Sequence, residues 1–179
     1  MNTPGQYAVV ASCLILGLIP AAAMAEDVIS TYNAGLRVGT PLRSEDIDQA
    51  DVFVSKQLPW KKNFACGWNL QSSAELALNV LQNDEEDGLS ASLSTDLHLF
   101  SPRHRFSFFS GVGAGALEDP VLGDYDFGGP IFFLFHAGAG LQITHSVSLS
   151  YRYAHQSNGH IYINNPSLNL NQLELRYFF

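Results

Sequence analysis

The sequence predicts an all-β fold, an eight-stranded antiparallel transmembrane β-barrel. Several segments alternate between apolar and polar residues, as strands do when one face meets lipid and the other a polar interior. The last of these segments ends on the aromatic residue Phe179, a residue type that barrels place at the membrane boundary. Beyond the N-terminal segment, no apolar run approaches the roughly 20 residues that a spanning helix needs. A membrane protein with these properties should be a barrel, because closure satisfies every strand edge in lipid.

Residues 1–25 have the features of a cleavable signal peptide. Tyr7 to Ala23 is apolar and rich in small residues, and Ala23-Met24-Ala25 has the small-x-small form of a signal-peptidase site. We expect cleavage after Ala25, so that residues 26–179 form a single barrel domain exported to the bacterial outer membrane. A weaker alternative is a lipoprotein-processing box at Val10-Ala11-Ser12-Cys13, which follows only a short apolar run.

Eight segments in chain order are expected to be strands. They lie at 31–39, 51–58, 68–81, 89–99, 106–116 and 131–143, followed by two strands within 147–179. The segment 89–99 alternates most cleanly, with Leu, Ala and Thr on one face and Ser, Asp and His on the other. The segment 51–58 is the least regular. Glycine and alanine in 106–116 and 131–143 suit the crowded interior of a small barrel.

The predicted connections differ in charge. Eight strands place both termini on the periplasmic side. The first three outer loops (40–49, 82–88 and 117–129) are then strongly acidic, whereas the periplasmic turns at 59–65 and 101–105 hold only basic charges. Buried charges need partners, so we expect a polar network inside the barrel from the residues on the inward faces, Arg37, Glu75, Asp96, His98, Arg152, Glu174 and Arg176.

Composition limits the partners. The net charge of −8 argues against nucleic acid as a partner. Cys66 is alone in the expected mature chain, which leaves no intramolecular disulfide. No cluster of Cys and His suggests a metal site, and no cofactor is expected.

The last two strands carry polar residues on the face that should meet lipid. Continuing the apolar face of the strand that begins near Val147 leads to His155 and Ser157, and the same face of the final strand carries Asn169 and Asn171. On an extended strand His155 and Ser157 lie about 7 Å apart along the chain, so strand twist would let the histidine act as a base toward the serine hydroxyl. The alternative is that these residues simply mark strand ends among lipid headgroups.

These residues also carry a family resemblance. The stretch His155-Gln156-Ser157-Asn158-Gly159, then Asn165-Pro166-Ser167-Leu168-Asn169 and a strand ending in Tyr177-Phe178-Phe179, resembles the PagL-type lipid A 3-O-deacylases. The family is an outer-membrane barrel with an exterior Ser-His-acid site that hydrolyses the ester-linked 3-hydroxyacyl chain at position 3 of lipid A. The resemblance implies Ser157 as nucleophile and His155 as general base, with Asn158 and the backbone around Gly159 as oxyanion donors.

The chain departs from this family at the third catalytic position, where Asn169 replaces Glu. An amide oxygen can still accept a proton from the imidazole and fix the ring, as Asn does in Cys-His-Asn proteases. It cannot balance the imidazolium charge. Glu174 is the only acid in the last strand, but its parity turns it inward.

The resemblance therefore implies an outer-membrane serine esterase that remodels lipopolysaccharide, with His155, Ser157 and Asn169 as the catalytic set. Lipid A would arrive laterally in the outer leaflet, its acyl chains against Tyr151, Tyr153, Leu173 and Leu175. The chief alternative is a non-catalytic small barrel with a structural or adhesive surface role. An acyltransferase that adds a chain to lipid A is a third. The accepted acyl-chain length and the oligomeric state, including a homodimer, stay open.

Overall fold

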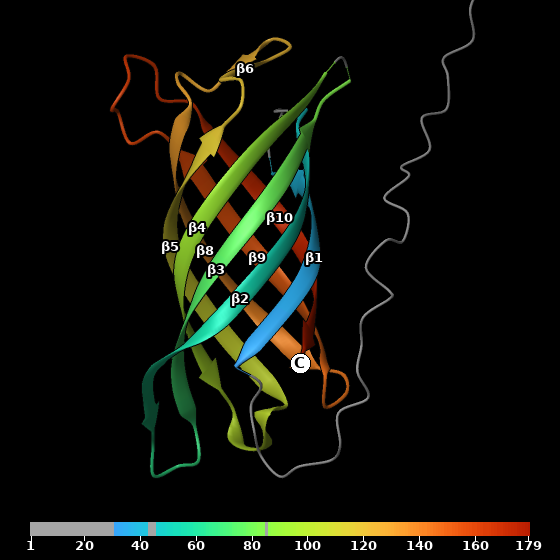
Figure 1. The fold of residues 1–179 in the computed structure, drawn as a ribbon, viewed down its shortest axis with the longest axis vertical. Coiled ribbons are helices and arrows are strands. Elements are labelled where there is room, and N and C mark those ends of the chain that lie inside the picture. The colour runs from blue at the N-terminus through green and yellow to red at the C-terminus, as the bar shows by residue number, and fades with distance from the viewer. Residues whose placement is uncertain (1–30, 43–45, 85) are drawn as a thin grey trace, which may run out of the picture.

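The computed structural model describes residues 31–42, 46–84 and 86–179, so the predicted signal peptide lies outside the described residues. Eight long strands close into an antiparallel barrel in which β1 pairs with both β2 and β10, as predicted (Figure 1). The strands are β1 (Tyr32–Pro41), β2 (Asp48–Asn63), β3 (Asn69–Gln82), β4 (Asp87–Phe100), β5 (Phe106–Leu117), β8 (Ile131–Gln142), β9 (Val147–Ser157) and β10 (Ser167–Phe178).

Two smaller features complete the fold. A 3-10 turn, η1 (Pro102–His104), lies between β4 and β5, and a short hairpin of β6 (Val121–Leu122) and β7 (Tyr125–Asp126) lies between β5 and β8. Within the described part of the chain, no helix is long and apolar enough to cross a membrane.

The second strand is longer and more regular than the sequence suggested. It spans Asp48–Asn63 and alternates exposed and buried side chains over its first half. Its pairing with β3 shifts register between Gln57 and Lys61, around Pro59. Proline lacks the N–H that a ladder needs, so the irregularity falls there. Beyond it, the strand continues as an exposed hairpin arm with β3.

The outer wall of the barrel is apolar. Outward side chains along the strands are about half exposed in the isolated chain, among them Leu36, Val54, Leu76, Leu93, Val112, Phe135, Leu149 and Leu175. An apolar band of this kind, alternating residue by residue with polar inward side chains, is the surface that a barrel presents to lipid.

An ion-pair network centred on Glu75 fills the middle of the barrel. The Glu75 carboxylate lies 2.7 Å from Arg37, 3.2 Å from Arg152 and 3.0 Å from Arg176. Glu174 accepts from Arg37 at 2.9 Å and from Arg176 at 3.0 Å. These charges come from β1, β3, β9 and β10, so the network ties distant strands together across the lumen, as the inward parity predicted.

Two residues that form interior ion pairs were missed from sequence. Asp51 accepts from Arg37 at 3.0 Å, but it lies on the strand whose pattern was least regular. His136 lies 2.7 Å from Asp96, on a strand dominated by Phe, Gly and Ala. His98, expected in the polar network, lies 3.1 Å from the Ser73 hydroxyl.

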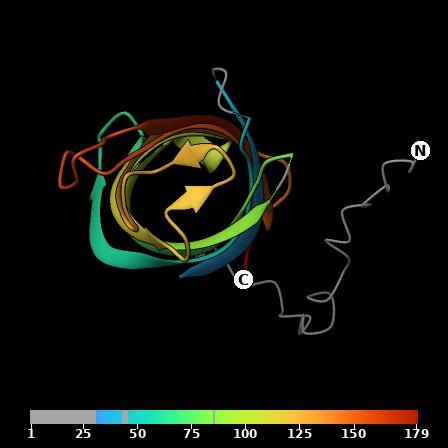
Figure 2. The same ribbon diagram turned by 90° about the horizontal axis from the view of Figure 1, so that it is seen from above.

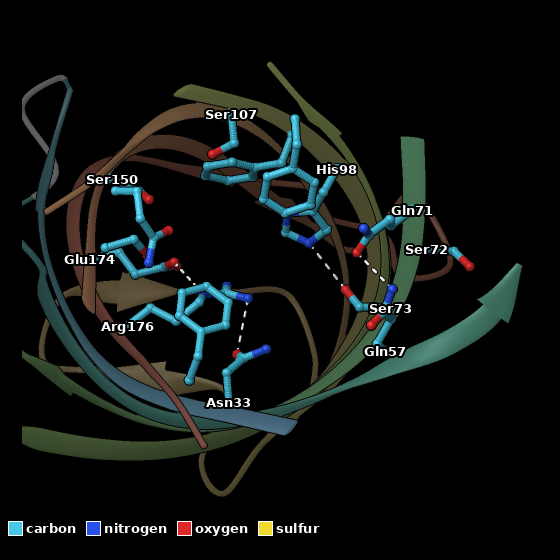
Figure 3. Close-up of a pocket in the computed structure, with 15 residues that line it drawn as sticks. Asn33, Gln57, Gln71, Ser72, Ser73, His98, Ser107, Ser150, Glu174 and Arg176 are labelled. Carbon is cyan, nitrogen blue, oxygen red and sulfur yellow. Dashed lines mark hydrogen bonds and ion pairs between the residues drawn. The ribbon is translucent and has the colours of Figure 1, made fainter. Parts of the chain in front are cut away.

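The remaining interior space is small. A cavity of about 40 Å³ lies among Asn33, Gln71, Ser73, His98, Glu174 and Arg176. On its walls Arg176 points toward Glu174 and Asn33, and His98 points toward Ser73 (Figure 3). This volume has room for a few water molecules at most. A lipid substrate therefore does not fit inside this part of the barrel.

The outer mouth of the barrel is closed by an apolar plug. The β6–β7 hairpin lies across the opening when the barrel is viewed along its axis (Figure 2). Beneath it, Leu122 and Phe127 join a buried cluster with Ile47, Leu81, Leu117, Phe132, Leu134, Ala154, Leu168 and Leu170. The barrel is thus apolar inside at its outer end and charged in its middle.

Candidate functional site

The candidate site arises where the polarity of β9 and β10 inverts. Over most of both strands the inward residues are polar or charged and the outward ones apolar, but at the outer end the order reverses. Inward positions there hold Ala154, Leu168 and Leu170, which are buried in the plug, and β9 keeps one polar inward residue, Gln156, which donates to Gln49. The outward positions hold His155, Ser157, Asn169 and Asn171. The plug takes the apolar side chains, so polar residues occupy the outer wall.

Strand pairing brings the predicted catalytic residues together. His155 lies directly opposite Asn169 in the β9–β10 register, and Ser157 lies opposite Ser167. His155 Nδ1 lies 2.8 Å from Asn169 Oδ1, and His155 Nε2 lies 3.2 Å from Ser157 Oγ. The three side chains form a continuous hydrogen-bonded chain, Asn169–His155–Ser157, and all are half-buried.

This geometry selects one tautomer of the imidazole. An amide oxygen can only accept hydrogen bonds, so Nδ1 of His155 must carry the hydrogen that Asn169 Oδ1 accepts. Nε2 is then unprotonated and faces the Ser157 hydroxyl as an acceptor. The arrangement is that of a nucleophile, a base and an orienting group in series.

Aromatic side chains border the site on its other side. In the β8–β9 register, Phe135 lies opposite His155 and Phe133 lies opposite Ser157. Both phenylalanines are nearly half exposed on the outer wall. The imidazole and hydroxyl therefore lie between an apolar strand and the polar end of β10.

Asn158 holds the loop that follows Ser157. Its side chain is 2% exposed and donates to Phe127 O at 3.0 Å and to Asn164 O at 2.6 Å, while its Oδ1 accepts from the His160 N–H at 3.0 Å. Gly159 and His160 both adopt positive φ, 62° and 64°. Asn158 was expected from sequence as an oxyanion donor, and in the structure its amide donates to these two carbonyls. The oxyanion roles of Asn158 and of the backbone around Gly159 stay predictions.

An outer groove reaches Tyr151 and Asn171, which share the outward faces of β9 and β10 with the site residues. It has a volume of about 550 Å³ and runs over β9, β10, β1, β2 and β3. Its lining includes Val38, Ala50, Val80, Tyr151, Asn171 and Leu173. The groove lies on the lipid-facing wall, because these residues alternate with the buried network residues of the same strands.

Other groups that sequence reasoning considered lie elsewhere. Glu174 is inside the barrel in the ion-pair network, on the opposite face of β10 from Asn169. In the described part of the chain, no three His, Cys, Asp or Glu side chains gather as metal ligands. Cys66 is exposed and free in the β2–β3 turn.

Sequence reasoning missed two side chains that contact the site. The Tyr153 hydroxyl donates to Asn169 Oδ1 at 2.7 Å, and Asn169 Nδ2 lies 3.4 Å from Ser167 Oγ. Tyr153 shares the outward parity of His155, but its period-two pattern gave it only the role of an apolar wall residue. Only the structure shows that its hydroxyl reaches diagonally across the strand pair to Asn169.

Comparison with solved structures supports the fold. The outer-membrane enzyme PagL matches with a TM-score of 0.72 and 17% identity, covering 82% of this chain and 99% of that one. Neisserial surface protein A has a TM-score of 0.49 and 13% identity, and the match covers 83% of this chain and 94% of that one. The Yersinia pestis outer-membrane protein Ail has a TM-score of 0.44 and 10% identity, and the match covers 83% of this chain and 99% of that one. No curated protein matches in sequence.

Comparison with protein-family models identifies the family of this chain. The model of the family described as lipid A 3-O-deacylase (PagL) matches residues 48–178, which include all the strands except β1. This match and the closed barrel fit a bacterial outer-membrane protein. The chain therefore belongs to the lipid A 3-O-deacylase (PagL) family.

Proposed function

We propose that this protein is an outer-membrane serine esterase that removes the ester-linked 3-hydroxyacyl chain at position 3 of lipid A. The observation that carries the proposal is the hydrogen-bonded chain Asn169–His155–Ser157 on the lipid-facing wall. Membership of the deacylase family supplies the substrate class. The small polar cavity inside the barrel offers no alternative site for a lipid.

Substrate would reach the site laterally from the outer leaflet. The outer end of β9 and β10 lies where the apolar wall gives way to the outer loops, which suits a molecule with acyl chains below and a sugar headgroup above. In this arrangement an acyl chain lies along the groove beside Tyr151 and Leu173. The ester to be cleaved then sits at Ser157, farther along β9 than Tyr151, where the groove ends on that strand.

In the first half of the reaction, His155 Nε2 accepts the proton of the Ser157 hydroxyl as Oγ attacks the ester carbonyl carbon. Negative charge develops on the carbonyl oxygen, for which we propose backbone N–H groups near Gly159 as donors. The tetrahedral intermediate collapses as the carbon–oxygen bond to the sugar breaks. His155 returns its proton to that sugar oxygen, leaving an acyl-enzyme on Ser157.

In the second half, His155 takes a proton from water as the water oxygen attacks the acyl-enzyme carbonyl. Collapse of this second intermediate breaks the bond to Ser157 Oγ, which recovers its proton from His155. A 3-hydroxy fatty acid leaves, and the enzyme is restored. Each step uses only protein groups, water and the ester, so the scheme needs no metal or cofactor.

Asn169 gives the reaction an uncharged orienting group. Its oxygen holds the Nδ1–H tautomer of His155, which the base function requires. It does not offset the positive charge that His155 acquires in the transition state. We therefore expect an active enzyme that is slower than one with a carboxylate at position 169.

Mass spectrometry of lipid A from cells that express the protein tests the proposal. Wild-type cells should lose the mass of one hydroxyacyl chain, and His155→Ala and Ser157→Ala should abolish the loss. Two matched controls should still remove the hydroxyacyl chain. They are His145→Ala, in the exposed β8–β9 turn, and Ser72→Ala, near the periplasmic end of β3. An unchanged lipid A profile with the barrel present in the outer membrane would favour the structural role, and a gain of mass would favour acyl transfer.

A further inference from the structure

Asn169 receives two hydrogen bonds on a single oxygen. Tyr153 lies two residues before His155 on β9 and reaches diagonally to β10, where its hydroxyl lies 2.7 Å from Asn169 Oδ1. His155 Nδ1 lies 2.8 Å from the same oxygen. A carbonyl oxygen has two lone pairs, so both donors can be accommodated. The other end of the amide faces Ser167 Oγ at 3.4 Å.

An amide, unlike a carboxylate, has two chemically different ends. If the Asn169 amide were rotated by half a turn, its NH₂ group would face His155 and donate to Nδ1. The hydrogen of the neutral imidazole would then have to be on Nε2, directed at Ser157. In that state His155 could not accept the serine proton. An asparagine at position 169 thus has a wrong orientation that a carboxylate would not have.

The Tyr153 hydroxyl discriminates between these two orientations. A phenol is a good donor and a poor acceptor, because its oxygen lone pair is delocalised into the ring. It therefore favours the amide oxygen at the position it faces, where it can donate. The Ser167 hydroxyl donates or accepts with little preference and stands at a longer distance, so it contributes less to the choice.

We propose that Tyr153 is a positioning residue that fixes the orientation of the Asn169 amide and, through it, the tautomer of His155. The structural part of this inference stands on the contacts among the three side chains. Its catalytic consequence rests on the proposed esterase function. In this arrangement Tyr153 performs part of the orienting task that the carboxylate performs elsewhere in the family.

The chain contains a matched control for this role. Tyr151 lies two residues before Tyr153 on the same face, and its hydroxyl donates to Asn171 in the same diagonal geometry. Both pairs join a tyrosine of β9 to an asparagine of β10. Only the Tyr153–Asn169 pair is connected to His155. Removing either hydroxyl therefore makes the same chemical change, but only the hydroxyl of Tyr153 is linked to the imidazole of His155 through its asparagine.

The direct test measures the tautomer of His155. Two-bond proton–nitrogen correlation spectra of the ¹⁵N-labelled full-length barrel in detergent micelles distinguish the two neutral forms, and His155→Gln assigns the signal. We expect the Nδ1–H form to dominate in wild type and in Tyr151→Phe, and a mixture of both forms in Tyr153→Phe. Folding of each variant is checked by its heat-modifiable migration on gels.

A second test uses the Asn169→Asp background, in which both ends of the side chain are acceptors and His155 must donate from Nδ1 in either orientation. Tyr153→Phe should alter the tautomer only when residue 169 is asparagine. In deacylation assays we expect Tyr153→Phe to lower kcat about five- to tenfold in the wild-type background, the worth of about one hydrogen bond, with less change in KM. The loss should be smaller in the Asp background.

The outcomes separate this inference from the proposed function. A pure Nδ1–H tautomer in Tyr153→Phe, equal to that in Tyr151→Phe, would overturn the positioning role whatever the activity. An equal change in tautomer or kcat in the Asn and Asp backgrounds would also overturn it, because a merely structural tyrosine would behave in that way. A tautomer shift confined to Tyr153→Phe, in a protein that removes no acyl chain, would support the positioning role and count against the esterase.

Discussion

His155 and Asn169 face each other directly across β9 and β10, with Nδ1 of the imidazole 2.8 Å from Oδ1 of the amide. The contact has the geometry of a histidine and its orienting acid, but the partner carries no charge. The site therefore has the hydrogen bonds of a Ser-His-acid arrangement but lacks the negative charge of the acid. Predictions about its activity follow from that difference.

Asn169→Asp should increase the rate of deacylation. The substituted side chain has nearly the same shape, and its negative charge would stabilise the imidazolium that forms in the transition state. Replacing the acid by Asn in a Ser-His-Asp protease costs about 10⁴-fold because the imidazole takes the wrong tautomer. Here Asn169 Oδ1 holds the Nδ1–H tautomer, so only the charge changes, and we expect a smaller gain of about tenfold in kcat, measured from initial rates on lipid A in micelles. Asn164→Asp, which places the same charge on an exposed side chain of the β9–β10 loop, is the control. Equal rates for Asn169→Asp and wild type would mean that this charge does not limit catalysis.

Glu75→Gln should strongly destabilise the barrel. Glu75 is 2% exposed and contacts three arginines, Arg37, Arg152 and Arg176. Removing one partner of a buried ion pair leaves uncompensated charge and costs roughly 3–5 kcal/mol. Urea unfolding in detergent micelles, followed by tryptophan fluorescence, measures the free energy of unfolding. Glu118→Gln removes an exposed carboxylate after β5 and should change it little, and a similar stability for the two variants would contradict the central role of Glu75.

Gly111→Ala should disturb the interior by steric overlap. A methyl group at this position on β5 would overlap the side chains of Asp96 and His136, which lie 2.7 Å apart. Overpacking of a close-packed interior typically costs about 1–3 kcal/mol. Gly88→Ala is the matched control, because its methyl group would meet only the flexible end of Leu122. The comparison of unfolding midpoints checks the prediction, which fails if Gly111→Ala is the more stable of the two.

Asn158→Asp should loosen the loop that follows Ser157. A carboxylate cannot donate to the carbonyls of Phe127 and Asn164, and it would face both of them with like partial charge. Each unmet buried group costs about 1–3 kcal/mol. We expect faster proteolysis within 158–166 and a loss of deacylation of at least tenfold, with the barrel itself intact by heat-modifiable migration. Unchanged proteolysis would show that these bonds do not hold the loop.

Period-two alternation was sufficient to predict the architecture. It identified the strands, the inward charges around Glu75 and the lipid-facing wall, because in a barrel each residue's face follows from its parity. It was weakest for β2, where Pro59 and the shifted pairing with β3 interrupt the pattern. The apolar plug under β6 and β7 was not predicted, since it depends on how a loop folds back over the mouth.

The candidate site could be predicted in part for the same reason. Parity placed His155, Ser157 and Asn169 on one face, and the register of β9 and β10 then set their distances. Parity carried no information about side chains that reach diagonally, such as the Tyr153 hydroxyl. Nor could it tell that the Asn158 amide turns away from the site to hold the loop.

Because the polarity inverts at the outer end of β9 and β10, the geometry of the site depends on the correct pairing of these two strands. A slip of one residue between these strands would either send His155 and Ser157 of β9 inward or bring Leu168 and Leu170 of β10 to the outer wall. The contact between His155 and Asn169 exists only in the native register. In a refolded sample, the fraction of molecules with that contact therefore equals the fraction of barrels with the native pairing of β9 and β10. The total content of β-structure does not give this fraction.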